Sequence, residues 1–107
     1  MERELVTFSH GDGILTARIS CEIDQHTARP IRERIDRETF LEQPRVLVLD
    51  MTRVGFMDSS GIALILGRVE VAAANGGTVH LSGLCPAVMK LVRLSGIERV
   101  KGLTVAP

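Results

Sequence analysis

The sequence is poor in the residues that stabilise small secreted domains and has no excess of the charge that binds nucleic acids. It contains no tryptophan, no tyrosine, three phenylalanines and two cysteines in 107 residues. Cys21 and Cys85 are too few for a disulfide scaffold and indicate reduced thiols. Net charge is also absent, because 13 basic residues balance 13 acidic ones. This balance argues against nucleic-acid partners and against a membrane-surface patch.

Long apolar runs, targeting segments and metal-binding motifs are absent as well. No run reaches the ~20 apolar residues that a membrane-spanning helix needs. The first residues carry charges of both signs, and the apolar stretch after them is too short for a signal peptide. We therefore expect a cytoplasmic protein. The histidines are scattered, and neither a CxxC nor an HExxH pattern occurs, so we expect no metal site.

The chain does contain enough apolar residues for one folded core. Its hydrophobic content of 45% excludes a disordered chain, and 107 residues predict a single domain over positions 1–107. After a predicted hairpin, strands alternate with helices, which predicts an α/β fold with a mixed sheet and helices packed against it. The predicted elements are strands at 4–9 and 14–20 joined by a turn at 11–13, a helix at 27–41, a strand at 46–49, a helix at 59–74, a strand at 78–81, a helix at 86–96 and a strand at 100–105.

One segment, Met57–Gly61, lies where a loop meets the start of a predicted helix. In open α/β sheets, ligands and partners bind at such positions, beyond the carboxyl ends of the strands. Asp58 is a good N-cap, because its carboxylate can accept hydrogen bonds from the backbone amides of the first helical turn. The segment is therefore either a helix cap alone or a cap that presents Ser59 and Ser60 to a partner.

The predicted helix at 59–74 has two faces of different composition. With about 100° of rotation per residue, one arc is apolar and should face the core. Its residues are Ile62, Ile65, Leu66, Val69, Ala72 and Ala73. The opposite side, the predicted outer stripe, carries Ser60, Leu64, Gly67, Arg68 and Val71. A solvent face normally carries more charge, so the stripe indicates a protein-docking surface; scattered exposed apolar residues are the alternative interpretation.

Enzymatic and cofactor-binding functions have little support in the sequence. There is no GxSxG nucleophile elbow, and no histidine stands at a diagnostic spacing from Ser59. The glycine turns at 11–13 and 75–77 lack the lysine and the spacing of a phosphate-binding loop. We therefore expect no enzyme activity and no cofactor, and keep a small serine hydrolase that uses Ser59 as an alternative.

Several segments resemble the anti-sigma factor antagonists with a STAS domain, and together they cover nearly the whole chain in order. The most specific is Phe56–Ile62, which contains the serine motif with its flanks. The others are Glu22–Ala28, Leu66–Arg68, Gly76–Gly77, Pro86–Val88 and Leu94–Ile97. Within this family, the sequence most resembles the sporulation antagonists that free the first forespore sigma factor.

The resemblance implies a mixed sheet of four or five strands with helices on one side. It also implies that Ser59, at the start of the second helix, is the phosphorylated residue and that Asp24 belongs to the same surface. Family members usually continue into a final helix beyond the position of Pro107. The residues that we expect to contact the partner are Asp24, Asp58, Ser60, Gly61, Leu64, Gly67, Arg68 and Val71.

The resemblance further implies the partners. The unphosphorylated antagonist binds an anti-sigma factor that is also an ATP-dependent serine kinase, and so releases the sigma factor. Phosphorylation of Ser59 abolishes binding, and a metal-dependent serine phosphatase restores it. A phosphoryl group adds ~1.5–2 negative charges beside Asp58, which is a sufficient reason for such a switch. The alternative within the fold is a STAS accessory subunit of a transporter or stress-signalling complex that is not phosphorylated.

Overall fold

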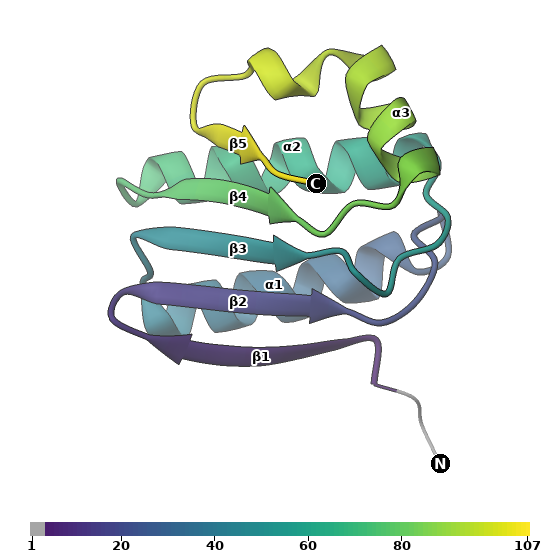
Figure 1. The fold of residues 1–107 in the computed structure, drawn as a ribbon. Coiled ribbons are helices and arrows are strands. Elements are labelled where there is room, and N and C mark those ends of the chain that lie inside the picture. Colours follow the sequence, from purple (N-terminus) through teal and green to yellow (C-terminus); the bar gives the residue numbers. More distant parts are fainter. Residues whose placement is uncertain (1–3) are drawn as a thin grey trace.

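A computed structural model describes residues 4–107 as a mixed sheet with helices packed against it (Figure 1). The strands are β1 (Val6–Gly11), β2 (Ile14–Ile19), β3 (Val46–Asp50), β4 (Thr78–Ser82) and β5 (Leu103–Val105). The helices are α1 (Ala28–Glu42), α2 (Ser59–Ala74) and α3 (Pro86–Ser95), followed by the short 3-10 helix η1 (Ile97–Arg99). The predicted fold class is confirmed, with five strands in the sheet.

The hairpin of β1 and β2 has a turn of left-handed backbone conformation. Asp12 has a φ of 54° and Gly13 a φ of 79°, as a two-residue type I′ turn requires. The two strands pair antiparallel, with Val6 opposite Ile19. The turn that the sequence predicts at 11–13 is therefore confirmed.

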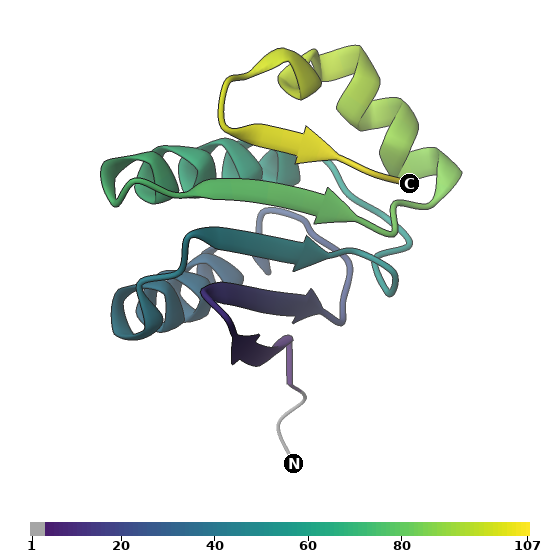
Figure 2. The ribbon, with the colours of Figure 1, turned by 60° about the vertical axis from the view of Figure 1, so that its left-hand side comes forward.

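The remaining strands run parallel in the order β2, β3, β4 and β5. α1 connects β2 to β3, and α2 connects β3 to β4. The two helices lie side by side on one face of the sheet, while α3 lies near its β5 end (Figures 1 and 2). Parallel strands end at a common edge, so two loops start from this edge: the loop after β2, which carries Asp24, and the loop after β3, which leads to Ser59 at the start of α2.

The core lies between the sheet and these two helices. Leu15, Ala17 and Ile19, which share one face of β2, are completely buried. Ile35 of α1 and Ile65 of α2 are also completely buried and belong to the same core. Within residues 4–107, no helix combines the length and the apolar character needed to cross a membrane.

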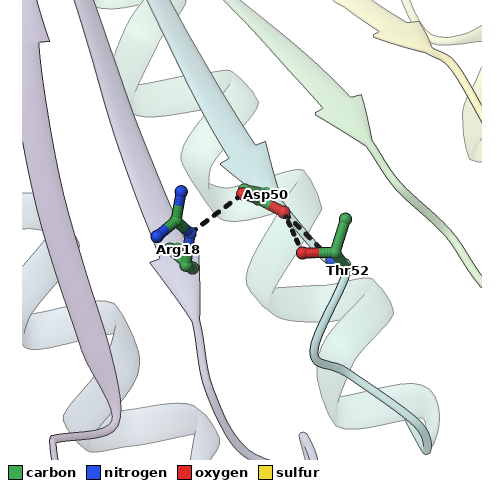
Figure 3. Close-up of polar contacts among 3 residues, drawn as sticks. All are labelled: Arg18, Asp50 and Thr52. Carbon is green, nitrogen blue, oxygen red and sulfur yellow. Dashed lines mark hydrogen bonds and ion pairs between the residues drawn. The ribbon is translucent and has the colours of Figure 1, made fainter.

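The opposite face of the sheet carries a polar contact between neighbouring strands (Figure 3). Nε of Arg18 donates to Oδ2 of Asp50 at 3.1 Å, and Oδ1 of Asp50 accepts from the amide and the hydroxyl of Thr52 at 3.0 and 2.7 Å. Partial burial would raise the pKa of Asp50, but these hydrogen bonds and the charge of Arg18 outweigh it and lower the pKa. The contact ties β2 to β3 and to the first residues of the β3–α2 loop.

The predicted boundaries of the last elements need correction. The final strand begins at Leu103 rather than at residue 100, and η1 separates it from α3. Gly96 and Gly102 adopt left-handed conformations, with φ of 79° and 92°. Such conformations end a helix or turn the chain, and so shorten the extended segment.

The predicted orientation of α2 is wrong for two residues of the outer stripe. Leu64 and Arg68 are each only 5% exposed. Conversely, Ile62 and Leu66 of the predicted core arc are half-buried, and Ala73 is exposed. The buried face of α2 is therefore rotated about the helix axis, toward α1, relative to the face that the sequence predicted.

An ion pair between the two helices explains this difference. Nη1 of Arg68 lies 2.9 Å from Oδ1 of Asp36 in α1, and the Arg68 side chain is almost completely buried. Burial raises the pKa of Asp36 despite the neighbouring guanidinium, and it lowers the pKa of Arg68. A hydrophobic-periodicity argument counts Arg68 as a surface residue, whereas here it fills the contact between α1 and α2.

Arg68→Ala should therefore lower the free energy of unfolding by about 2–4 kcal/mol, because it leaves the Asp36 carboxylate without its partner and removes packed methylenes. Chemical denaturation measures this loss. Ala63→Gln, at an exposed position of the same helix, is the matched control and should change stability by less than about 0.5 kcal/mol. Equal stabilities of Arg68→Ala and the wild type would show that Arg68 faces solvent after all.

Candidate functional site

Two loops meet beyond the carboxyl ends of β2 and β3, and backbone hydrogen bonds join them. Ile23 and Met57 form a parallel β-bridge. The amide of Ile23 donates to the carbonyl of Phe56 at 3.1 Å, and the amide of Asp58 donates to the carbonyl of Ile23 at 3.1 Å. The bridge therefore holds the start of α2 next to the loop that leads into α1.

Asp58 caps α2 as the sequence predicts. Its Oδ1 accepts a hydrogen bond from the amide of Ser60 at 2.8 Å, and its carbonyl accepts one from the amide of Gly61 at 2.9 Å. Ser59 lies in the first helical turn with its side chain exposed, whereas Ser60 is half-buried. The more accessible of the two hydroxyl groups is thus that of Ser59.

Gly61 is buried under the side chain of Met57. A Cβ at this position would collide with Cγ and Sδ of Met57 and would lie 3.3 Å from Cγ2 of Ile23. Glycine therefore allows α2 to begin directly against the bridge between the two loops. The role of Gly61 is to position the surface rather than to form an exposed contact.

Asp24 forms a compact set of hydrogen bonds before α1. Its Oδ1 accepts from the amides of His26 and Thr27 at 2.8 and 3.0 Å, and its own amide donates to Oγ1 of Thr27 at 3.0 Å. The bonds from the Thr27 and His26 amides lower the pKa of Asp24 below its ordinary value of 3.8. Asp24 and Asp58 thus place two carboxyl groups at the same edge of the sheet.

Two clefts open beside these residues. One has a volume of about 460 Å³ and is lined by Cys21, Glu22, Asp24, Thr27, Arg53 and Gly55. The other, the α1–α2 cleft, has a volume of about 300 Å³ and is lined by Gln25, Ala28, Arg29, Arg32, Ser60, Ala63 and Leu64. In residues 4–107 no group of three or more histidine, cysteine, aspartate or glutamate side chains could hold a metal ion.

The structure brings only part of the predicted site together. The residues that gather at this edge are Asp24, Asp58, Ser59, Ser60 and Gly61. Gly67 and Val71 lie further along α2 and are half-buried, and a Cβ at Gly67 would meet no atom within 4 Å. Arg68 was expected on the docking surface and is instead buried and paired to α1. Leu64 is only 5% exposed and lines the α1–α2 cleft.

Phe56 is a surface residue that the sequence pattern does not single out as a contact. Its side chain is 50% exposed, although Val54, two residues before it, and Met57, directly after it, are buried. Its carbonyl accepts the hydrogen bond from Ile23, so the loop that carries it is fixed. Aromatic residues, phenylalanine among them, are enriched at protein–protein interfaces. The signal in the sequence was its place at the start of Phe56–Ile62, the segment that most specifically resembles the antagonist family.

Residues 6–105 match the family model of the STAS domain. The chain belongs to the STAS domain family. It is 33% identical over 95 residues to the anti-sigma F factor antagonist of Paenibacillus polymyxa, with 89% of this chain and 81% of that protein covered. It is 31% identical over 94 residues to MlaB of Escherichia coli (strain K12), the intermembrane phospholipid transport system binding protein, with 88% of this chain and 90% of MlaB covered.

The fold of this STAS domain is also similar to that of the anti-sigma factor antagonist SpoIIAA. The unphosphorylated form matches with a TM-score of 0.78 and 27% identity over 95% of this chain and 88% of the other. The phosphorylated form of the Bacillus protein matches with a TM-score of 0.70 and 26% identity over 95% of this chain and 91% of the other. The similarity therefore extends over almost the whole STAS domain.

The Asp24 hydrogen bonds predict how the stability of this STAS domain depends on pH. Asp24→Asn keeps an oxygen acceptor for the amides of His26 and Thr27 but removes the charge. A carboxyl group whose pKa is lowered by folding stabilises the folded state above its unfolded pKa, and this contribution is lost as the pH falls through the folded pKa. Below about pH 5, the melting temperature of the wild type should therefore fall more steeply than that of Asp24→Asn. Parallel curves in circular dichroism would contradict this assignment.

Proposed function

We propose that this STAS domain is an anti-sigma factor antagonist that is switched by phosphorylation of Ser59. The observation that supports this most directly is the exposed Ser59 side chain on the first turn of α2, capped by Asp58, at the sheet edge that also carries Asp24. The similarity to an anti-sigma F factor antagonist and to both forms of SpoIIAA supports the same function.

The partner in this proposal is an anti-sigma factor that is also an ATP-dependent serine kinase. The unphosphorylated chain binds it and releases the sigma factor. The kinase transfers the γ-phosphoryl group of ATP to Oγ of Ser59, while ADP leaves and the hydroxyl proton is lost. A metal-dependent serine phosphatase then hydrolyses the phosphoester with water and restores binding. The chain is a substrate in both reactions and not an enzyme, and we propose that it works in the cytoplasm with these partners.

Added charge is sufficient to explain the switch. A phosphoserine at position 59 carries about −1.5 to −2 charges at an edge that already holds the carboxyl groups of Asp24 and Asp58. The N-terminus of α2 stabilises this negative charge, typically by ~0.3–1 kcal/mol. When a partner covers the phosphoryl group, the group loses its contact with water. This desolvation costs more free energy than the helix terminus supplies, so the phosphorylated surface binds weakly. The bridge between Ile23 and Met57 can stay intact throughout.

A second candidate function is that of an accessory subunit of a transport system, bound without phosphorylation. The similarity to MlaB supports this candidate. The two candidate functions differ in one testable property: Ser59 is phosphorylated by a kinase in the antagonist and is not phosphorylated in the accessory subunit. A serine hydrolase has no support from the geometry, because in residues 4–107 neither Ser59 nor Ser60 forms a hydrogen bond with a histidine.

The first test of the proposal is the site of phosphorylation. With its kinase and ATP, the wild type and Ser60→Ala should each gain one phosphoryl group, whereas Ser59→Ala should gain none. The physical reason is that Ser59 is exposed, while Ser60 is half-buried in the α1–α2 cleft. Intact-mass measurement reads this out directly. A phosphorylated Ser59→Ala would overturn the assignment, and an unmodified wild type would favour the transport subunit.

Phe56 provides a second test, because it should anchor the partner. Phe56→Ala should weaken binding of the anti-sigma factor by about 1–2 kcal/mol, which is roughly tenfold in affinity, with little change in melting temperature. Phe40→Ala is the matched control, since Phe40 is 75% exposed at the other end of α1. Titration calorimetry should show wild-type affinity for the control. Equal affinities of the two variants would place Phe56 outside the interface.

A further inference from the structure

We propose that the α1–α2 cleft binds a carboxylate side chain of the anti-sigma factor. This inference rests on the proposed function, because it identifies the chemistry that the same partner must present beside Ser59. The cleft lies between the first turns of the two helices that cover the sheet, and Ser60 forms part of its wall.

The lining of the cleft contains hydrogen-bond donors and no carboxyl group. Arg29 and Arg32 contribute guanidinium groups, Ser60 a hydroxyl and Gln25 a side-chain amide. Its remaining walls, formed by alanine and leucine side chains, are apolar. A guanidinium group offers a planar pair of donors that matches the two oxygens of a carboxylate. The cleft therefore fits a small anion better than a cation or an apolar side chain.

The nearby acidic residues Glu33 and Asp36 neutralise these arginines only in part. Oε1 of Glu33 lies 2.9 Å from Nε of Arg29, but both side chains are largely exposed, so this pair is weak. Asp36 is paired with the buried Arg68, and neither Glu33 nor Asp36 lines the cleft. Burial lowers the pKa of Arg68, the charge of Asp36 raises it, and the charge of Arg32 lowers it further, so Arg32 lies close to this ion pair.

The position of the cleft links it to the switch. Ser60 directly follows Ser59 in the chain, and Ala63, also in the lining, lies about one helical turn beyond Ser59. A phosphoryl group on Ser59 would therefore repel a carboxylate that approaches the cleft and would compete for the same guanidinium groups. Phosphorylation then removes a favourable contact as well as adding an unfavourable charge.

Arg32→Ala and Arg37→Ala test the proposal, because they remove the same charge from exposed positions of the same helix. Only Arg32 lines the cleft. The purified anti-sigma factor of the same genome serves as the probe in surface plasmon resonance at low and at high salt. Arg32→Ala should lower the affinity about tenfold at low salt, mainly through faster dissociation, while Arg37→Ala should change it less than about twofold. Both variants should melt at the wild-type temperature.

Combination with Ser59→Glu distinguishes a carboxylate of the partner from an acidic group at position 59 of this chain as the occupant of the cleft. If the cleft holds a carboxylate of the partner, the carboxylate introduced at position 59 already cancels part of its attraction, so Arg32→Ala should weaken binding less in that background than in the wild type. Equal affinities of Arg32→Ala and Arg37→Ala would overturn the cleft proposal. A loss of affinity that Arg32→Ala causes only in the presence of Ser59→Glu would overturn it as well. Failure of the proposed function looks different, because the wild type would then not bind the anti-sigma factor at all.

Discussion

The parallel bridge between Ile23 and Met57 is the interaction on which the candidate surface depends. Its hydrogen bonds tie the loop after β2 to the loop after β3. Gly61 leaves room for Met57, so α2 can begin directly against the bridge. Two loops that are distant in the sequence thereby become one fixed surface, on which Asp24, Asp58 and Ser59 keep constant positions relative to one another.

A fixed surface makes a single phosphoryl group an effective switch. The chain has no net charge, yet its charges are separated locally, with carboxyl groups at the sheet edge and arginines in the adjoining α1–α2 cleft. A dianion on Ser59 changes the balance of this small area without requiring any loop to move. Binding energy at interfaces is concentrated in a few contacts, so a local change of this kind is enough to alter affinity.

The sequence predicts those parts of the molecule that depend on local patterns. The predicted turn at 11–13 has the left-handed backbone that joins β1 to β2, and Asp58 marks the start of α2 because capping needs only the first turn. The orientation of α2 could not be predicted in the same way, since the partner of Arg68 is Asp36 on another helix. A periodicity argument treats such an arginine as solvated. The exposure of Phe56 could not be predicted either, because it depends on how two loops join in the fold.

Amide hydrogen exchange in the unphosphorylated and phosphorylated chain tests most directly whether phosphorylation adds charge to an unchanged surface. The amides of Ile23 and Asp58 make the hydrogen bonds that join the two loops. We predict that both amides keep the same protection in the two forms, while the affinity for the anti-sigma factor falls. Loss of protection at Ile23 or Asp58 on phosphorylation would contradict this, because it would show that the switch works by opening the loops.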